Sequence, residues 1–250
     1  MTRMENVFSK TARYYDKLYA RKDYAGEVQR LISFLGVERD RKQLTLLDIA
    51  CGTGLHIECL RRHFDIEGLD ICPELLEVAR ERNPDTPFHL GDMTAFDLGK
   101  QFDVITCLFS SIGYVKTLDK LRSAVRSMAA HLKPGGVLAV EPWFTPENWH
   151  PNTVHAQFID EPELKIARIN TSFVKDKVSV FDLHHLVGTP EGTEHLVEHH
   201  ELGLFEVEEM ISVMEEAGLI VEYDPDGLTG RGLYIGKREA LPGKPDAGDA

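Results

Sequence analysis

The chain has 250 residues, of which 42% are hydrophobic and 28% charged, which is typical of one folded domain with at most a small second lobe. Its formal net charge of −13 opposes binding to nucleic acid, because basic clusters are as short as Arg21-Lys22. No apolar run approaches the roughly 20 residues that span a bilayer, and the N-terminus lacks the apolar stretch of a secretory signal, so we expect a cytoplasmic protein with no membrane segment.

Short apolar runs alternate with helical patterns through the first 140 residues. The expected strands cover residues 44–50, 66–69, 87–90, 102–108 and 137–140. Pro73 begins a helix at a position where its missing N–H costs little. Apolar residues at three- and four-residue spacing predict another helix over residues 117–132, followed by a Lys-Pro-Gly-Gly turn at 133–136. Because parallel strands need crossover connections, this alternation predicts an α/β fold with a mainly parallel, Rossmann-like sheet.

The pattern changes after Trp143. Residues 155–205 alternate like strands, with a turn at 175–177 between strands over residues 166–174 and 178–187. We therefore expect residues 143–204 to form an antiparallel β lobe inserted into an α/β domain of residues 1–142 and 205–238.

Helical periodicity returns over residues 207–217, with Gly218 as the predicted C-terminal cap. Two further strands, over residues 220–223 and 232–236, complete the main sheet, and the last of them is expected to be antiparallel. Residues 239–250, rich in Pro, Gly and Asp, are expected to form a disordered tail.

The strongest motif is D-I-A-C-G-T-G at residues 48–54, placed between a strand and a helix. Its two glycines let the backbone turn sharply and approach a ligand closely. The next strand ends at Asp70, whose carboxylate can accept hydrogen bonds from both ribose hydroxyls of an adenosine. The third ends in Gly91-Asp92-Met93, where Asp92 can accept from the adenine amino group while Met93 packs on the ring. All three meet at the carboxyl edge of the sheet, where open α/β sheets bind ligands.

A dinucleotide-binding fingerprint would place a third glycine where this chain has Ile57. A bulky residue is tolerable there if no pyrophosphate lies beside it. The pattern therefore favours S-adenosylmethionine (SAM) over NAD, with an NAD-dependent oxidoreductase and purely structural turns as the alternatives.

The motifs D-I-A-C-G-T-G, G-L-D at 68–70 and G-D-M at 91–93 resemble the signature of class I SAM-dependent methyltransferases. Three runs are more particular: F-S-S-I-G-Y at 109–114, V-E-P-W at 140–143 and G-R-G-L at 230–233. They resemble the N,N-dimethyltransferases that finish desosamine and mycaminose, which methylate the 3-amino group of a TDP-linked 3,6-dideoxyhexose. The resemblance runs from about Tyr15 to Gly236. It departs in W-F-T-P at 143–146, in the shorter stretch between Tyr15 and Lys22, and most of all in the lobe, so the sugar and its nucleotide stay open.

The resemblance implies SAM as the cofactor and a small molecule, a nucleotide-linked amino sugar, as the partner. Tyr15 and Tyr114 would position the amine. The implied cofactor contacts are Tyr24, Asp48, Ala50, Cys51, Gly52, Thr53, Gly54, His56, Asp70, Ile71, Gly91, Asp92, Met93 and Phe109. The implied substrate contacts are Ser110, Ser111, Glu141, Trp143 and Arg231. Arg231 would clamp the diphosphate, or else form a surface ion pair. Trp143 would line the nucleotide-sugar site, or else pack against the lobe.

Transfer from a sulfonium requires a lone pair aligned behind the methyl carbon, so we expect catalysis mainly by positioning. Methylation of N, O or C in another small metabolite, and a noncatalytic SAM-binding scaffold, remain alternatives, and a homodimer stays open. We expect no metal site. Histidines occur at 184, 185, 195, 199 and 200, but alternation sends neighbours to opposite faces of a strand. Ser110 and Ser111 lack the context of a nucleophile elbow.

Overall fold

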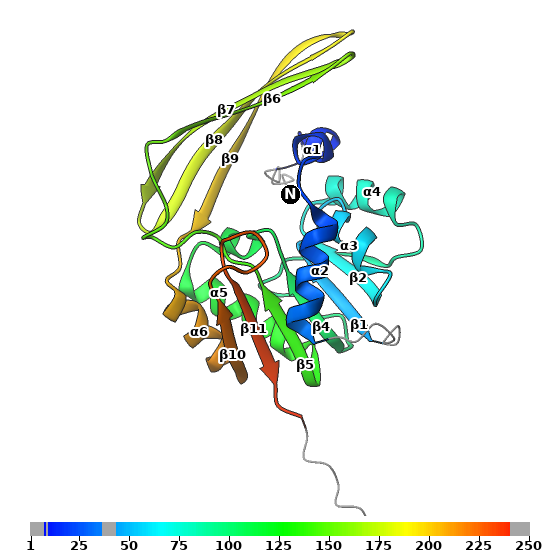
Figure 1. The fold of residues 1–250 in the computed structure, drawn as a ribbon, viewed down its shortest axis with the longest axis vertical. Coiled ribbons are helices and arrows are strands. Elements are labelled where there is room, and N and C mark those ends of the chain that lie inside the picture. The colour runs from blue at the N-terminus through cyan, green and yellow to red at the C-terminus, as the bar shows by residue number, and fades with distance from the viewer. Residues whose placement is uncertain (1–7, 9, 37–43, 241–250) are drawn as a thin grey trace, which may run out of the picture.

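The computed structural model describes residues 8, 10–36 and 44–240, and these residues form two sheets (Figure 1). The larger sheet has seven strands in the order β10-β11-β5-β4-β1-β2-β3. Its strands are β1 (Thr45–Ile49), β2 (Asp65–Asp70), β3 (Phe88–Leu90), β4 (Phe102–Cys107), β5 (Leu132–Val140), β10 (Leu219–Asp224) and β11 (Leu233–Arg238). The smaller sheet has four strands: β6 (Val154–Glu161), β7 (Leu164–Lys175), β8 (Val178–Thr189) and β9 (Gly192–Gly203).

The larger sheet is parallel except around β11. Strand β1 pairs in parallel with β2 and β4, β4 with β5, and β2 with β3. Strand β11 runs antiparallel to both β5 and β10. The predicted fold class, a Rossmann-like methyltransferase sheet with an antiparallel last strand, is confirmed.

Helices cover both faces of this sheet. The helices α5 (Leu118–Ala130) and α6 (Val207–Glu216) pack on one face, and α2 (Tyr24–Leu35) and α3 (Leu55–Leu60) pack on the other. Helix α4 (Pro73–Arg82) begins at its proline, as predicted. Two helices near the N-terminus, α1 (Ala12–Leu18) and α2, were not predicted, although they carry side chains of the site described below.

The prediction for residues 117–136 is partly wrong. Helix α5 ends at Ala130, and Leu132 already begins β5, which includes the Lys-Pro-Gly-Gly segment. Gly135 adopts a positive φ of 79°, and the pairing with β4 shifts register between Phe102 and Val104. The glycines therefore form an irregularity within the strand and not a separate turn, because a register shift absorbs the left-handed residue.

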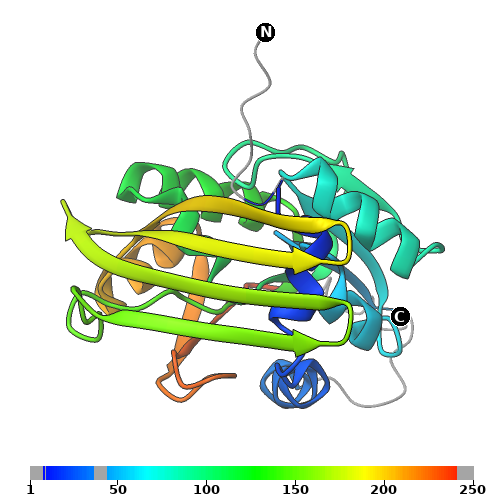
Figure 2. The ribbon, with the colours of Figure 1, turned by 90° about the horizontal axis from the view of Figure 1, so that it is seen from above.

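The second sheet lies over the carboxyl edge of the first (Figures 1 and 2). Alternation along β8 directs Phe181, Leu183 and His185 inward, where they are buried, while Leu186 is exposed on the outer face. The inner face packs against α1 and against the 3-10 helix η1 (Ser111–Val115). Gly113 of η1 permits the close approach, since a Cβ there would lie 3.0 Å from the side chains of Leu202 and Trp143.

The chain leaves the larger sheet at the end of β5, forms the smaller sheet over β6 to β9, and returns to the larger sheet through α6 and β10. No helix of the described residues is long and apolar enough to cross a membrane. The expected disordered tail falls largely on residues 241–250, which lie outside the described residues.

Candidate active site

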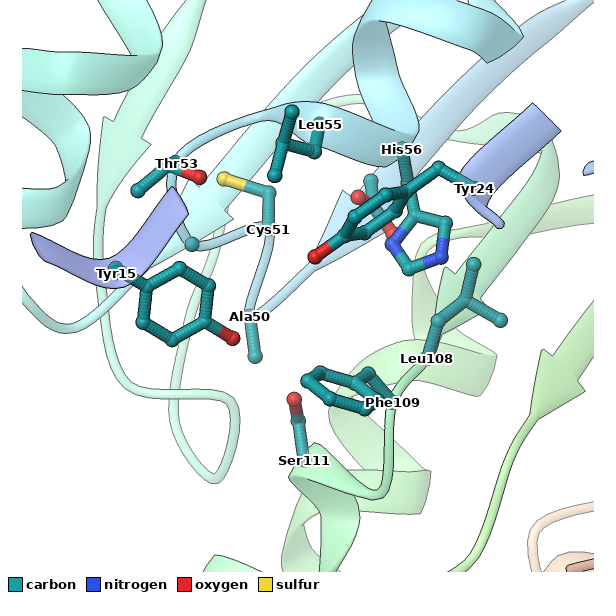
Figure 3. Close-up of a pocket in the computed structure, with 12 residues that line it drawn as sticks. Tyr15, Tyr24, Ala50, Cys51, Thr53, Leu55, His56, Leu108, Phe109 and Ser111 are labelled. Atoms are coloured by element: carbon teal, nitrogen blue, oxygen red, sulfur yellow. The ribbon is translucent and has the colours of Figure 1, made fainter. Parts of the chain in front are cut away.

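A cavity opens at the carboxyl edge of the large sheet (Figure 3). Its lining combines the loop after β1, the loop after β4 and tyrosines from the two N-terminal helices. The lining residues are Tyr15, Tyr24, Asp48, Ala50, Cys51, Gly52, Thr53, Leu55, His56, Leu108, Phe109 and Ser111. All of these except Leu55 and Leu108 are residues that the sequence assigned to the cofactor or the substrate.

The loop after β1 is held in an unusual backbone conformation. Ala50, Gly52 and Gly54 have φ values of 56°, 56° and 74°, in the left-handed region that favours glycine. Asp70 supports this turn, because its Oδ2 accepts a hydrogen bond from the Gly52 N–H at 2.8 Å. Its Oδ1 accepts from the Cys72 N–H at 2.8 Å. Each carboxylate oxygen can accept a further hydrogen bond, so Asp70 can both shape the loop and bind ribose hydroxyls.

Asp48 is a buried carboxylate in the wall of the cavity. It is 2% exposed, and its Oδ1 accepts a hydrogen bond from the Thr106 hydroxyl at 2.7 Å. Burial raises the pKa of Asp48 to about 6, although His56 and Thr106 oppose the shift. A cationic ligand in this cavity would stabilise the charged form of Asp48, which suits the sulfonium and ammonium groups of SAM.

Tyr24 and His56 form a second wall of the cavity, with their rings 4.8 Å apart in an edge-to-face arrangement. Behind them, Glu27 of α2 accepts hydrogen bonds from His56 Nε2 at 3.0 Å and from Lys22 Nζ. Burial alone would raise the pKa of Glu27, but these two hydrogen bonds bring it below its usual range. Glu27 therefore remains ionised and orients both neighbours.

The ends of β2 and β3 present apolar side chains to solvent. Ile71 is 55% exposed and Leu90 is 62% exposed, while Met93 is partly buried beside them. Asp92 follows Gly91, and its Oδ1 accepts from the backbone and the hydroxyl of Thr94, each at 2.8 Å. Asp92 and Met93 do not line the described cavity, so their contact with an adenine ring stays a prediction.

The loop after β4 is strained and is supported from below by Glu141. Phe109 and Ser110 have positive φ values of 51° and 64°. Glu141 is fully buried; its Oε2 accepts from the Phe109 N–H at 2.7 Å and its Oε1 from the Thr229 hydroxyl at 2.5 Å. Both carboxylate oxygens thus accept hydrogen bonds from the protein itself and hold these segments together. This placement favours a supporting role for Glu141, whereas the sequence predicted a substrate contact.

Arg231 lies above the same loop. Its Nη1 donates to the Ser110 hydroxyl at 2.5 Å, and its guanidinium carbon lies 5.5 Å from the Phe109 ring centre and 5.8 Å from the Trp143 ring centre. Among the described residues, no carboxylate forms an ion pair with Arg231. Within the described residues, Arg231 therefore does not form the surface ion pair that was the alternative to a substrate contact.

Trp143 and Tyr114 join the α/β domain to the lobe. Trp143 packs beside Phe181 of β8, and its indole N–H donates to the Ser179 hydroxyl at 2.9 Å. Tyr114 bonds through its hydroxyl to His200 Nδ1 of β9 at 2.8 Å. Neither residue lines the cavity directly; Trp143 has the lobe-packing position that the sequence left open, with Arg231 over its ring.

The chain matches a model of the methyltransferase domain over residues 46–136. It is 39% identical over 224 residues to a dTDP-3-amino-3,6-dideoxy-α-D-glucopyranose N,N-dimethyltransferase of Streptomyces fradiae, covering 89% of this chain and 86% of the relative. It is 35% identical over 249 residues to a dTDP-4-amino-2,3,4,6-tetradeoxy-D-glucose N,N-dimethyltransferase of Saccharopolyspora spinosa, covering 95% of this chain and all of the relative. The chain belongs to the SAM-dependent methyltransferases, in the family of these sugar N,N-dimethyltransferases.

Solved structures agree with this assignment. The methyltransferase superposes on DesVI of Streptomyces venezuelae with a TM-score of 0.85 and 37% identity, over 92% of this chain and 98% of the other. It superposes on SAM-bound CalS10, an amino pentose methyltransferase of Micromonospora echinaspora, with a TM-score of 0.79 and 33% identity, over 95% of this chain and 99% of the other. SAM is therefore the cofactor, and the expectation of a SAM enzyme over an NAD enzyme is confirmed.

Sequence reasoning missed several residues that shape the methyltransferase site. Glu27 lies with Val28 and Leu31 on the buried face of α2. A carboxylate on an otherwise apolar helix face could have been recognised in the sequence as a candidate site residue. Tyr19 stacks edge-to-face on Phe109 at 5.2 Å, and Arg168 of the lobe donates to the Tyr19 hydroxyl at 3.2 Å. No local pattern pairs Tyr19 with Arg168, because they are 149 residues apart.

Among the described residues, no group of three or more His, Cys, Asp or Glu side chains is arranged to hold a metal ion. The neighbouring residues His184 and His185 lie on opposite faces of β8, as strand alternation requires. His184 is exposed, whereas His185 is buried and only 1% exposed.

Proposed function

We propose that the enzyme transfers two methyl groups in succession from SAM to the amino group of a dTDP-linked amino deoxysugar. The observation that carries the proposal is Arg231, a guanidinium without a carboxylate partner among the described residues, held between aromatic rings above the loop that lines the methyl-donor cavity. In a chain with a net charge of −13, such a local cation is what an anionic substrate requires.

A second arginine supports an anionic substrate. Arg168 reaches inward from the lobe to Tyr19, whose ring contacts Phe109, and Phe109 in turn contacts Arg231. As with Arg231, no carboxylate among the described residues forms an ion pair with Arg168. The two guanidinium groups thus approach one aromatic pair from the lobe and from the α/β domain, and planar guanidinium forks bind diphosphate oxygens well.

The residues around the cavity can catalyse transfer by positioning. When bound, SAM supplies an electrophilic methyl group, and the Asp48 carboxylate and the polar backbone of the loop after β1 suit its charged end. Burial raises the pKa of Tyr15 well above its ordinary value, so its hydroxyl stays neutral and can donate or accept a hydrogen bond. A neutral hydroxyl at the cavity wall orients an amine without removing a proton.

The test of the proposed function is a panel of acceptors offered with SAM. The panel contains dTDP-sugars with the amine at carbon 3 or carbon 4, the matching free amino sugars and unrelated amines, each followed by mass spectrometry. We expect methyl gain only on nucleotide-linked amino sugars. Equal methylation of the free amino sugar would show that the arginines do not serve a diphosphate, and would favour another small metabolite.

We also propose that two copies of the chain associate through the outer face of the lobe. This face presents a group of exposed apolar side chains: Val154, Phe158, Ile169, Phe173, Leu186 and Val197. The outer face carries opposite charges at one end, where Lys165 pairs with Asp160. A two-fold dimer would place this face against the same face of a second copy and remove its apolar side chains from water.

We further propose that residues 143–204 act as a substrate-binding lobe on a SAM-binding domain formed by residues 1–142 and 205–238. Two hydrogen bonds of the lobe support these separate roles: Arg168 donates to Tyr19, and His200 bonds to Tyr114. A cytoplasmic location is proposed because Cys51, Cys59, Cys72 and Cys107 are all free thiols, which suits a reducing compartment.

A further inference from the structure

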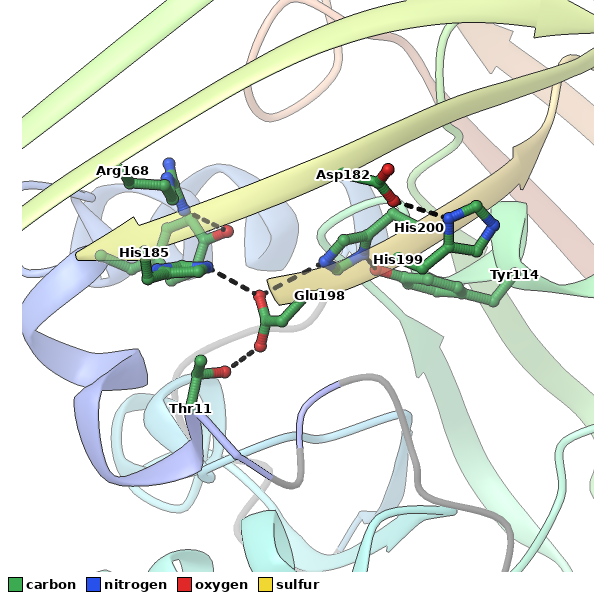
Figure 4. Close-up of polar contacts among 9 residues, drawn as sticks. Thr11, Tyr114, Arg168, Asp182, His185, Glu198, His199 and His200 are labelled. Carbon is green, nitrogen blue, oxygen red and sulfur yellow. Dashed lines mark hydrogen bonds and ion pairs between the residues drawn. The ribbon is translucent and has the colours of Figure 1, made fainter. Parts of the chain in front are cut away.

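A buried carboxylate in the lobe gathers three hydrogen-bond donors. Glu198 of β9 accepts from His185 Nε2 at 3.1 Å, from His200 Nε2 at 3.4 Å and from the hydroxyl of Thr11, which precedes α1 (Figure 4). Glu198 is 4% exposed, His185 1% and His200 3%. A buried carboxylate so well supplied with donors is stabilised as an anion.

The cluster extends from the lobe into the α/β domain through His200. Its second ring nitrogen, Nδ1, lies 2.8 Å from the hydroxyl of Tyr114 on η1 (Figure 4). When the Nε2–H of His200 donates to the Glu198 carboxylate, Nδ1 is the nitrogen that accepts from the Tyr114 O–H. Carboxylate, imidazole and phenol thus form one continuous chain of hydrogen bonds.

One aromatic ring, that of Phe8, connects Tyr114 to the lining of the cavity. The Phe8 ring contacts Tyr114 at 6.0 Å and also Tyr15 at 5.7 Å, and Tyr15 lines the cavity. After donating to His200, the Tyr114 oxygen can still accept a hydrogen bond from a neighbouring N–H.

Dimethylation creates a need for such a chain, and this step of the argument rests on the proposed function. In the first transfer the amine lone pair bonds to the methyl carbon while the carbon–sulfur electron pair goes to sulfur. The products are S-adenosylhomocysteine and a secondary ammonium, R–NH₂⁺–CH₃. The nitrogen has no lone pair until it loses one proton, so the second transfer requires a proton acceptor.

We propose that His200 of the lobe accepts this proton through the Tyr114 hydroxyl, with Glu198 holding the resulting charge. One ammonium proton passes to the Tyr114 oxygen as the Tyr114 proton passes to His200 Nδ1. The nitrogen recovers its lone pair, and an imidazolium forms beside the Glu198 carboxylate. The proton reaches solvent when the site opens for exchange of the spent cofactor.

The surrounding groups are consistent with this direction of transfer. Burial alone would raise the pKa of Glu198, but hydrogen bonds from His185 and His200 bring it below its ordinary value, so the carboxylate is charged. Burial raises the pKa of Tyr114 well above its ordinary value, with added repulsion from Tyr19, Glu198 and Asp70, so Tyr114 relays a proton without remaining a phenolate. The Phe181 ring stacks on His200 at 5.1 Å and brings no charge.

The test compares the two transfers separately as a function of pH. His200→Gln keeps a hydrogen-bonding side chain but cannot take up a proton. Wild type and variant are given SAM with dTDP-3-amino-3,6-dideoxy-α-D-glucopyranose, or with its N-monomethyl derivative, between about pH 6.5 and about pH 9. We expect the variant to accumulate the monomethyl product, with the second transfer slowed about tenfold or more at the acidic end. The defect should shrink as pH rises, because solvent then deprotonates the ammonium.

The matched control is His199→Gln. His199 adjoins His200 but is exposed on the other face of β9, where it bonds to Asp182 at 2.7 Å. Its product ratio and pH profile should equal those of wild type. If His200→Gln no longer binds S-adenosylhomocysteine, the variant is not properly folded, and Tyr114→Phe is used in its place. Tyr114→Phe removes the hydroxyl at the other end of the same hydrogen bond and should give the same pH-dependent defect in the second transfer.

A wild-type product ratio and pH profile in His200→Gln would overturn the inference. A defect of equal size at every pH would also overturn it, since loss of packing alone predicts that result. Absence of methylation by the wild-type enzyme would reject the proposed function itself, and the inference with it.

Discussion

Arg231 and Ser110 are linked by a hydrogen bond of 2.5 Å from Nη1 to Oγ, and the same Ser110 hydroxyl donates to the Pro142 carbonyl at 2.7 Å. Ser110 is 1% exposed and has a positive φ. A strained, buried serine thus fixes one branch of the guanidinium, which forms no ion pair with any carboxylate of the described residues. The hydrogen bond holds a cation beside the loop that lines the cavity, where the proposed function places the substrate diphosphate.

Replacing Arg231 with Ala should weaken binding of the nucleotide sugar without affecting SAM. Loss of a charge-assisted hydrogen bond predicts a rise in KM of about 10- to 100-fold. Steady-state kinetics with a dTDP-amino sugar, together with calorimetric SAM binding, measures both effects. Arg122→Ala, which removes an exposed arginine paired with Glu216 on the helical face, is the control. An unchanged KM in Arg231→Ala would contradict the diphosphate assignment.

Binding of SAM should strengthen as pH rises through about 6. Burial raises the pKa of Asp48 to about 6 in the free enzyme, and a cationic ligand favours the ionised form. From that pKa, affinity at pH 5 should be about tenfold lower than at pH 7. Calorimetric titration across this range measures the effect, and Asp48→Asn should abolish the dependence. A flat profile in the wild-type enzyme would show that the cofactor charge does not reach Asp48.

The same shift has a consequence for the stability of the cofactor-free enzyme. The folded-state pKa of Asp48 lies above its unfolded value, so the protonated form favours folding. The stabilisation is full below about pH 4 and is lost as pH rises through about 6. Asp48→Asn should therefore unfold at a higher temperature than wild type at neutral pH without cofactor, provided that the amide keeps the contact with Thr106. Scanning calorimetry at several pH values tests the sign.

Tyr15→Phe should lower the activity only modestly. Its ring packs against Tyr19 at 4.7 Å and against Phe8 at 5.7 Å, and Phe preserves both contacts. Loss of one neutral hydrogen bond predicts a decrease in kcat of about 2- to 10-fold. Single-turnover rates with saturating SAM measure this change. A loss of about a thousandfold with SAM binding intact would mean that Tyr15 transfers a proton, contrary to the positioning mechanism.

Phe158→Asp on the outer face of the lobe should yield a monomer. Phe158 is 65% exposed and lies in register with Ala167, which pairs with the exposed Leu186. A carboxylate at this point would be buried without a partner in a two-fold interface. Light scattering after size-exclusion chromatography compares the variant with wild type. A wild-type enzyme that is monomeric at all concentrations, or a variant that stays dimeric, would contradict the proposed interface.

The methyl-donor side of the site could be predicted because its motifs act locally. In residues 48–54 the turn needs left-handed backbone, and glycine is the residue that adopts this conformation readily. The strand before the turn determines the edge of the sheet at which the glycines lie. The contacts of the lobe could not be predicted in this way. Thr11 and Glu198 are 187 residues apart, and alternation along β9 says which face Glu198 occupies but not what covers it.

Long-range contacts explain two features that local sequence patterns did not predict. The strand β5 begins at Leu132 because Leu132 already pairs with Phe102 of β4, and pairing resumes at Val137 after the register shift at the glycines. Local turn signals do not reveal such pairing. Glu141 serves the scaffold because Thr229, 88 residues away, returns beside it. In both cases long-range packing decides between local alternatives that the sequence leaves equally plausible.

In the proposed reaction, one amine on a dTDP-linked sugar receives two methyl groups from SAM. The most direct measurement is the amount of S-adenosylhomocysteine formed per amino sugar when SAM is in excess, with the products resolved by mass spectrometry. We expect two equivalents, with a monomethyl intermediate that appears and is consumed. Formation of one equivalent with a stable monomethyl product, or of none with a bound cofactor, would contradict it.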